Sequence, residues 1–117
     1  MAQRGSHERH DVLPGGEFGR RRRELTPSQS AAFETFDKAV FADGALPARM
    51  KQIIAVAVAH VTQCPYCIKG HTKAALRAGA PPEEFMEAVW VASEMRAGGG
   101  YAHSNLMLAT LAEEEKK

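Results

Sequence analysis

The sequence has little cysteine, little net charge and no long apolar run. Its 117 residues include two cysteines and carry a formal net charge of +1. Two cysteines are too few for a secreted scaffold stapled by disulfides. A nearly neutral chain gives little support to binding of nucleic acid through an overall basic field. The longest apolar run, Ile53–Ala59, is much too short to span a bilayer.

The remaining composition is that of an ordinary globular protein. Hydrophobic residues make up 44% and charged residues 25% of the chain, and the length allows one domain. The first ten residues are polar, without the basic start and apolar run of a signal peptide. We therefore expect a soluble cytoplasmic protein that does not bind membranes. A close cysteine pair in that compartment is usually redox-active or metal-binding.

The chain divides into a predicted N-terminal tail or arm, residues 1–23, and a helical domain, residues 24–117. Gly15–Gly16 and Gly19 are expected to break any regular element in the tail. The basic run Arg20–Arg23 is interpreted as a solvated arm that packs on a neighbouring subunit. A nucleic-acid patch is the weaker alternative, because acidic residues flank the run and no aromatic residues are interleaved with it.

Apolar residues recur at helical spacing from Thr26 onward, which predicts an all-α fold of about five to six helices. Capping residues, prolines and glycines set the expected limits of these helices. The predicted helices cover residues 26–43, 47–61, 65–78 and 82–97, with a last helix through 106–111. Gly98–Gly100 is expected to interrupt the chain between the last two. The segment Ile53–Val61 is rich in isoleucine and valine, so a buried strand is the alternative there.

The motif that carries chemistry is Cys64-Pro65-Tyr66-Cys67, followed four residues later by His71. If Cys64 begins a helix, these three side chains fall on one stripe. Unsatisfied N–H groups and the partial positive charge at a helix N-terminus favour thiolate over thiol. The i, i+3 spacing allows the two sulfurs to meet in a disulfide. A histidine one turn beyond Cys67 could take its proton or stabilise the thiolate.

Two less specific interpretations of the motif remain open. The cysteines could be small core residues and His71 a hydrogen-bonded core histidine. Alternatively, Cys64, Cys67 and His71 could bind zinc, with His60 as a fourth ligand. That alternative is a non-enzymatic, oligomeric module that holds zinc, and it requires His60 to reach from the preceding helix.

Two families share these residues. The sequence CPYC is also the active-site motif of glutaredoxins, but the chain after Gly79 offers no further strand for a thioredoxin-like fold. A closer match is the stretch from Lys51 through Cys64-Pro65-Tyr66-Cys67-Ile68-Lys69-Gly70-His71 to Ala78-Gly79-Ala80. It resembles the AhpD-like alkylhydroperoxidase branch of the carboxymuconolactone decarboxylase family. The resemblance extends from about Leu46 to Leu111, which is over half the chain.

The resemblance implies an AhpD-like helical bundle that forms a homo-oligomer, a trimer or a hexamer. It implies a thiol-dependent peroxidase or dithiol–disulfide oxidoreductase, with no cofactor beyond a redox-active Cys64–Cys67 disulfide. Cys67 would react with the hydroperoxide substrate, and Cys64 would then close the disulfide. His71 would belong to a proton relay. An external dithiol, a lipoyl group or a thioredoxin-like protein, would restore the thiols.

One position departs from the family pattern. The relay usually begins with a glutamate twelve residues before the first cysteine, where this chain has Gln52. An amide cannot carry a proton as a carboxylate can, but it can hydrogen-bond and orient. His60 is a candidate to replace the missing base. The remaining enzyme hypothesis is the sister branch, a carboxymuconolactone decarboxylase-like enzyme, for which both cysteines would be dispensable.

Overall fold

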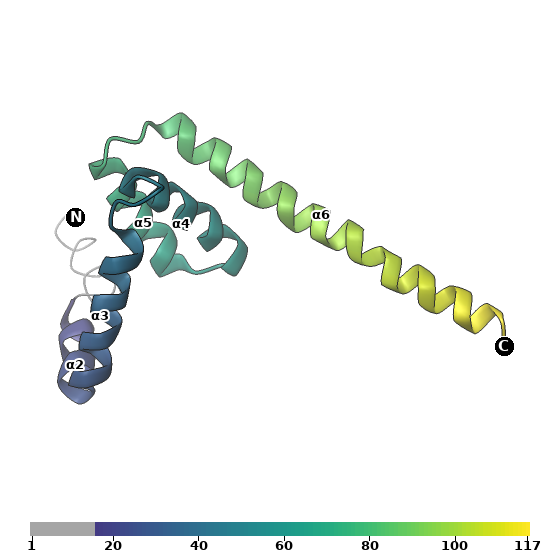
Figure 1. Cartoon of the computed structure of the whole chain (residues 1–117), viewed down its shortest axis with the longest axis horizontal. Coiled ribbons are helices and arrows are strands. Elements are labelled where there is room, and N and C mark those ends of the chain that lie inside the picture. The colour runs from purple at the N-terminus through teal and green to yellow at the C-terminus, as the bar shows by residue number, and fades with distance from the viewer. Residues whose placement is uncertain (1–15) are drawn as a thin grey trace, which may run out of the picture.

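The computed structural model describes residues 16–117, and this part of the chain forms five helices and no strand. The all-α prediction is therefore confirmed, and the strand alternative for residues 53–61 is wrong, since these residues lie within a helix. Figure 1 shows two helices packed together at the upper left, from which the remaining helices extend downward and to the right. The helices are α2 (Glu17–Leu25), α3 (Pro27–Phe41), α4 (Ala48–Thr62), α5 (Pro65–Arg77) and α6 (Pro82–Glu115).

The centre of the fold is the antiparallel pair α4 and α5, joined by a two-residue turn. Gln63 has a φ of 60°, in the left-handed region, and its N–H bonds to Ala59 O to end α4. Val56 and Ala59 of α4 and Ala75 of α5 are buried. Alanines at the contact let the two helices approach closely. The short turn and small side chains thus fix α5 against α4, which places the CxxC motif.

Helix α6 is a single unbroken helix of 34 residues, so the predicted interruption at Gly98–Gly100 is wrong. Each glycine disfavours a helix by only about 1 kcal/mol relative to alanine, and good helix formers flank all three. Within residues 16–117, no turn or close approach requires these glycines. A Cβ at Gly98 would meet only the flexible Glu94 side chain, and one at Gly99 or Gly100 would meet nothing within 4 Å.

The N-terminal prediction is partly outside the described residues. Gly15 belongs to the part that the structure does not describe, and so do the other residues before Gly16. Gly19, however, is buried within α2, so the break expected there is wrong. A single glycine is tolerated because α2 packs against α3. Arg20–Arg23 form exposed turns of α2, and their role as an arm on a neighbouring subunit stays a prediction.

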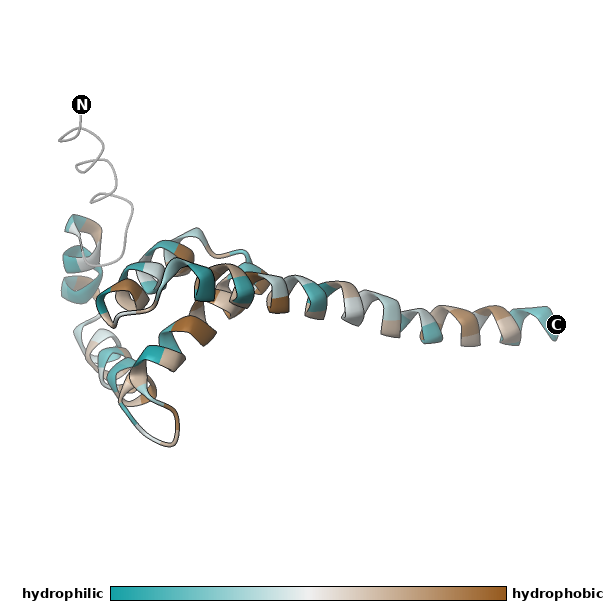
Figure 2. Ribbon diagram, turned by 90° about the horizontal axis from the view of Figure 1, so that it is seen from above, coloured by the Kyte–Doolittle hydropathy of each residue, from teal (hydrophilic) through white to brown (hydrophobic). Residues whose placement is uncertain are grey.

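The chain is extended for its length. Its radius of gyration is 19.7 Å, whereas a compact domain of about 100 residues has about 13 Å. Helix α6 packs against α4, where its Ala92 is buried. Figures 1 and 2 show its C-terminal part projecting away from α4 and α5, with hydrophobic residues along it. Many large apolar side chains are consequently more than half exposed, including Phe33, Trp90, Tyr101 and Leu106. No helix among the described residues has the length and hydrophobicity needed to span a membrane.

Candidate dithiol site

Cys64 occupies the N-cap position of α5. Its backbone is extended, with φ −99° and ψ 105°, and its Sγ accepts a hydrogen bond from the Cys67 backbone N–H at 3.3 Å. Pro65 follows at the first helical position, where its fixed φ suits the helix and no N–H is needed. The sequence thus places a sulfur where serine or aspartate would normally cap a helix. At the N-cap the thiolate form of the sulfur is stabilised relative to the thiol, because N–H donors point toward it.

The two sulfurs lie 2.8 Å apart, within hydrogen-bond distance, and both cysteines are free and partly buried. Either thiol can donate while both are protonated, but the backbone N–H bond stabilises negative charge on Cys64, so the ionised Cys64 sulfur accepts from the Cys67 thiol. Donation from the Cys67 thiol, followed by that N–H bond, lowers the pKa of Cys64. The pKa of Cys67 is raised, chiefly because its thiol proton is held by Cys64 and secondarily because of burial. The first negative charge of the reduced pair therefore resides on Cys64.

His71 lies one turn after Cys67 on the same face of α5. Its Nδ1 is 2.7 Å from Oε1 of Gln52, which comes from α4. The Phe41 ring, from the end of α3, stacks on the imidazole with a centroid distance of 4.9 Å and an interplanar angle of 25°. Three helices therefore fix the position of this ring.

Lys51 holds the end of α3 in place. Its ammonium donates to the Val40 carbonyl at 2.9 Å and to the Ala42 carbonyl at 2.6 Å. Carbonyls in the last turn of a helix lack intrahelical partners and attract cations. The Lys51 contacts join the C-terminus of α3 to α4 and keep Phe41 over His71.

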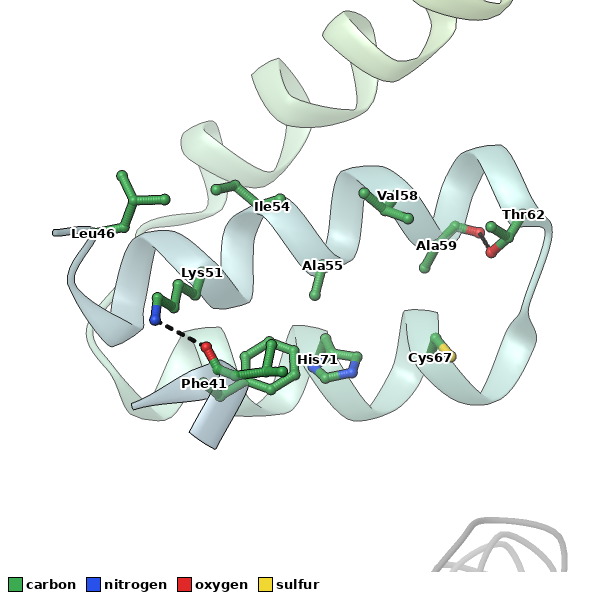
Figure 3. Close-up of a pocket in the computed structure, with 11 residues that line it drawn as sticks. Phe41, Leu46, Lys51, Ile54, Ala55, Val58, Ala59, Thr62, Cys67 and His71 are labelled. Atoms are coloured by element: carbon green, nitrogen blue, oxygen red, sulfur yellow. Dashed lines mark hydrogen bonds between the residues drawn. The ribbon is translucent and has the colours of Figure 1, made fainter. Parts of the chain in front are cut away.

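An open, mainly apolar pocket of about 540 Å³ adjoins Cys67 and His71. Figure 3 shows it between α4 and α5, with Cys67 and His71 on one wall and α4 side chains on the other. Cys67, but not Cys64, lines this pocket. The lining residues are Val40, Phe41, Leu46, Lys51, Ile54, Ala55, Val58, Ala59, Thr62, Cys67 and His71.

The structure brings together three of the four predicted site residues. Cys64, Cys67 and His71 share the first two turns of α5. His60 does not line the pocket; its Nδ1 donates to the Val56 carbonyl of its own helix at 2.8 Å. Its part in a proton relay stays a prediction. Across residues 16–117, no three potential ligand side chains are grouped to hold a metal ion, so the zinc hypothesis gains no support from this part of the chain.

Sequence reasoning missed the parts that Phe41 and Lys51 play at the site. In the sequence, Phe41 is one of several apolar residues at helical spacing, and Lys51 is only the first residue of the stretch that resembles the family. Their partners are distant in the sequence, so no local pattern reveals these contacts. Only the packing of α3 against α4 brings Phe41 to His71.

The fold and site define a small all-α protein with a dithiol pair at a helix N-terminus. The model of the carboxymuconolactone decarboxylase family matches residues 27–109, and the chain belongs to this family. A protein of Paracoccus denitrificans known as uncharacterized protein 4 in the cox locus is 66% identical over 82 residues, which cover 70% of this chain and 74% of that protein.

Solved structures show the same likeness. A crystal structure from Methanobacterium thermoautotrophicum has a TM-score of 0.71 at 33% identity, covering 75% of this chain and 96% of that one. A carboxymuconolactone decarboxylase family protein of Thermotoga maritima has a TM-score of 0.52 at 27% identity, covering 75% and 94%. For the Thermotoga protein an involvement in the antioxidative response has been suggested.

Proposed function

We propose that this protein is a dithiol–disulfide oxidoreductase with thiol-dependent peroxidase activity, of the AhpD-like branch of its family. The observation that carries the proposal is the free cysteine pair, with sulfurs 2.8 Å apart at the N-terminus of α5. Two thiols at this distance can be oxidised to a disulfide with little movement. The suggested antioxidative involvement of the Thermotoga relative agrees with this chemistry.

The catalytic cycle has three steps. The Cys67 thiolate attacks the terminal oxygen of a hydroperoxide, the O–O bond breaks, and the alkoxide leaves as an alcohol after it gains a proton. Cys67 is now a sulfenic acid. The Cys64 sulfur attacks the Cys67 sulfur and displaces water, which forms the disulfide. An external dithiol, lipoyl or thioredoxin-like, then reduces this disulfide by exchange and is itself oxidised.

The first attack is assigned to Cys67 although Cys64 carries the charge of the resting pair. Cys67 is the sulfur that lines the pocket with His71, so a peroxide in the pocket meets Cys67 first. Its raised pKa means that its proton must be removed before it attacks. His71, one turn away, is the candidate acceptor of that proton.

The assignment of the two sulfurs is tested with Cys67→Ser and Cys64→Ser. We expect Cys67→Ser to abolish peroxide consumption. We expect Cys64→Ser to consume one equivalent of peroxide and then stop, with Cys67 left as a sulfenic acid that dimedone traps. Trapping at Cys64 in the Cys67→Ser variant instead would reverse the roles. Full turnover by both variants would refute the proposal, because peroxide would then be consumed without the cysteine pair.

The proposal also includes the setting of the enzyme. We propose a homo-oligomer, a trimer or a hexamer, which the exposed apolar side chains of α3 and α6 support. We also propose that it works in the cytoplasm, where external dithiols keep thiols reduced.

A further inference from the structure

The hydrogen bond between Gln52 and His71 determines which ring nitrogen carries the histidine proton. Gln52 Oε1 lies 2.7 Å from His71 Nδ1. An amide oxygen can only accept a hydrogen bond, so Nδ1 must be the donor. A neutral imidazole has one N–H, and the other nitrogen is then an acceptor. With the proton on Nδ1, Nε2 is left free to accept a proton.

The surroundings of His71 hold the ring in this orientation without adding a negative charge. Phe41 stacks on the ring from α3 and is neutral. Among the pocket residues, the titratable groups besides His71 are Cys67 on α5 and Lys51 on α4. The Lys51 ammonium is directed at two carbonyls of the α3 terminus. Gln52 is the direct partner of the ring, and it is uncharged.

We propose that Gln52 is a positioning residue that keeps neutral His71 in the Nδ1–H tautomer, with Nε2 as the acceptor for the Cys67 proton. Side chains of a helix lean toward its N-terminus, which directs the His71 ring toward Cys67 one turn earlier. A carboxylate in place of the amide would accept the same hydrogen bond but would also stabilise the imidazolium. The amide therefore fixes the tautomer while favouring a ring that is still able to accept a proton.

The use of Nε2 in proton transfer rests on the proposed function, whereas the tautomer itself does not. The test is ¹⁵N NMR of the histidine side chains in the full chain, with Gln52→Leu, Gln52→Glu and, as a matched control, Gln29→Leu. Gln29 is exposed on α3, so its replacement should leave His71 unchanged. The His71 signals are assigned by their loss in His71→Asn.

We expect the neutral His71 ring in the wild type and in Gln29→Leu to carry its proton on Nδ1. In Gln52→Leu the Nδ1 signature should be lost or mixed with the Nε2–H tautomer. In Gln52→Glu the Nδ1–H should be retained, and the added carboxylate should stabilise the doubly protonated ring. An Nε2–H tautomer in the wild type, or an unchanged His71 in Gln52→Leu, would overturn the proposal.

A kinetic arm separates this proposal from the proposed function. The rate at which Cys67 is oxidised by a hydroperoxide is measured against pH in the same variants, each in the Cys64→Ser background. We expect at least a tenfold loss of rate in Gln52→Leu, and partial rescue in Gln52→Glu with the rise of the profile moved to higher pH. If neither the parent nor any variant reacts with peroxide, but the tautomer is as expected, the proposed peroxidase activity is refuted and the positioning role of Gln52 stands. If the Cys64→Ser parent reacts with peroxide, and all Gln52 variants react at the same rate with the same pH profile, then Nε2 does not accept the Cys67 proton.

Discussion

At the scale of single residues, the central feature is the unequal pair of thiols at the start of α5. Cys64 accepts hydrogen bonds from the Cys67 thiol and from the Cys67 N–H, and its pKa is lowered. The Cys67 pKa is raised by the same contact. The pair therefore loses its first proton more readily than an ordinary thiol does, and loses its second less readily.

This inequality predicts how alkylation depends on pH. Because the pKa of Cys64 is lowered, its thiolate is present at lower pH, and iodoacetamide should modify it there faster than it modifies an ordinary thiol. Cys67→Ala removes the thiol donor, so the alkylation profile of Cys64 should move to higher pH. Cys67→Ser retains a hydroxyl donor and should lie between the two. Mass spectrometry of the alkylated peptide gives the rates, and coincident profiles in all three proteins would contradict the account.

The residues of the site were predictable to different degrees. Cys64, Cys67 and His71 follow from a local pattern, because 3.6 residues per turn place them on one face of a helix. Gln52 was recognisable as a candidate orienting residue, since it stands twelve residues before Cys64, where the family usually has a glutamate. The stacking of Phe41 depends on how α3 meets α4, and no sequence period encodes this contact.

At the scale of elements, the glycines of α6 show that helix limits cannot be predicted from the positions of proline and glycine alone. Pro47 and Pro65 correctly indicated where α4 and α5 begin, and Gly79 indicated where α5 ends. Gly98–Gly100 gave the same local signal, yet α6 continues through them. Helix formation is cooperative, so long flanking segments can carry a few unfavourable residues. A break needs a turn or a partner as well as glycine, and the described chain supplies neither.

The structure predicts that Gly99→Ala stabilises the protein. A Cβ at Gly99 has open space around it, and alanine restricts the unfolded chain and favours the helix. The expected gain is about 0.5–1 kcal/mol in the free energy of unfolding, measured by urea denaturation monitored by circular dichroism. Gly79→Ala is the contrasting control, since a φ of +96° makes any side chain there unfavourable. A loss of stability in Gly99→Ala would contradict an unobstructed helix at this point.

At the scale of the whole molecule, a single chain buries few of its apolar side chains. Val56 is the one large side chain that is fully buried among the described residues. The core is small and lies where α4 packs against α5 and α6, with Ala92 of α6 also buried. Apolar side chains on α3 and α6 remain exposed, with Trp90 at 68% and Phe33 at 66%. Such extensive exposed apolar surface is typical of chains that associate.

The account therefore predicts a particle larger than one chain. Light scattering coupled to gel filtration should give three or six times the 12.7 kDa of the chain, across a range of protein concentrations. Association would cover apolar surface on α3 and α6 that a lone chain leaves in water. A stable, folded particle with the mass of a single chain would contradict the proposal of a homo-oligomer.

The most direct test of the central claim is the intact mass of the reduced protein before and after one equivalent of an organic hydroperoxide, with thiols titrated in parallel. The account predicts loss of both thiols and a mass decrease of about two units, the mark of a Cys64–Cys67 disulfide, fully reversed by an external dithiol. Two thiols that persist at unchanged mass would contradict the assignment of this protein as a dithiol peroxidase.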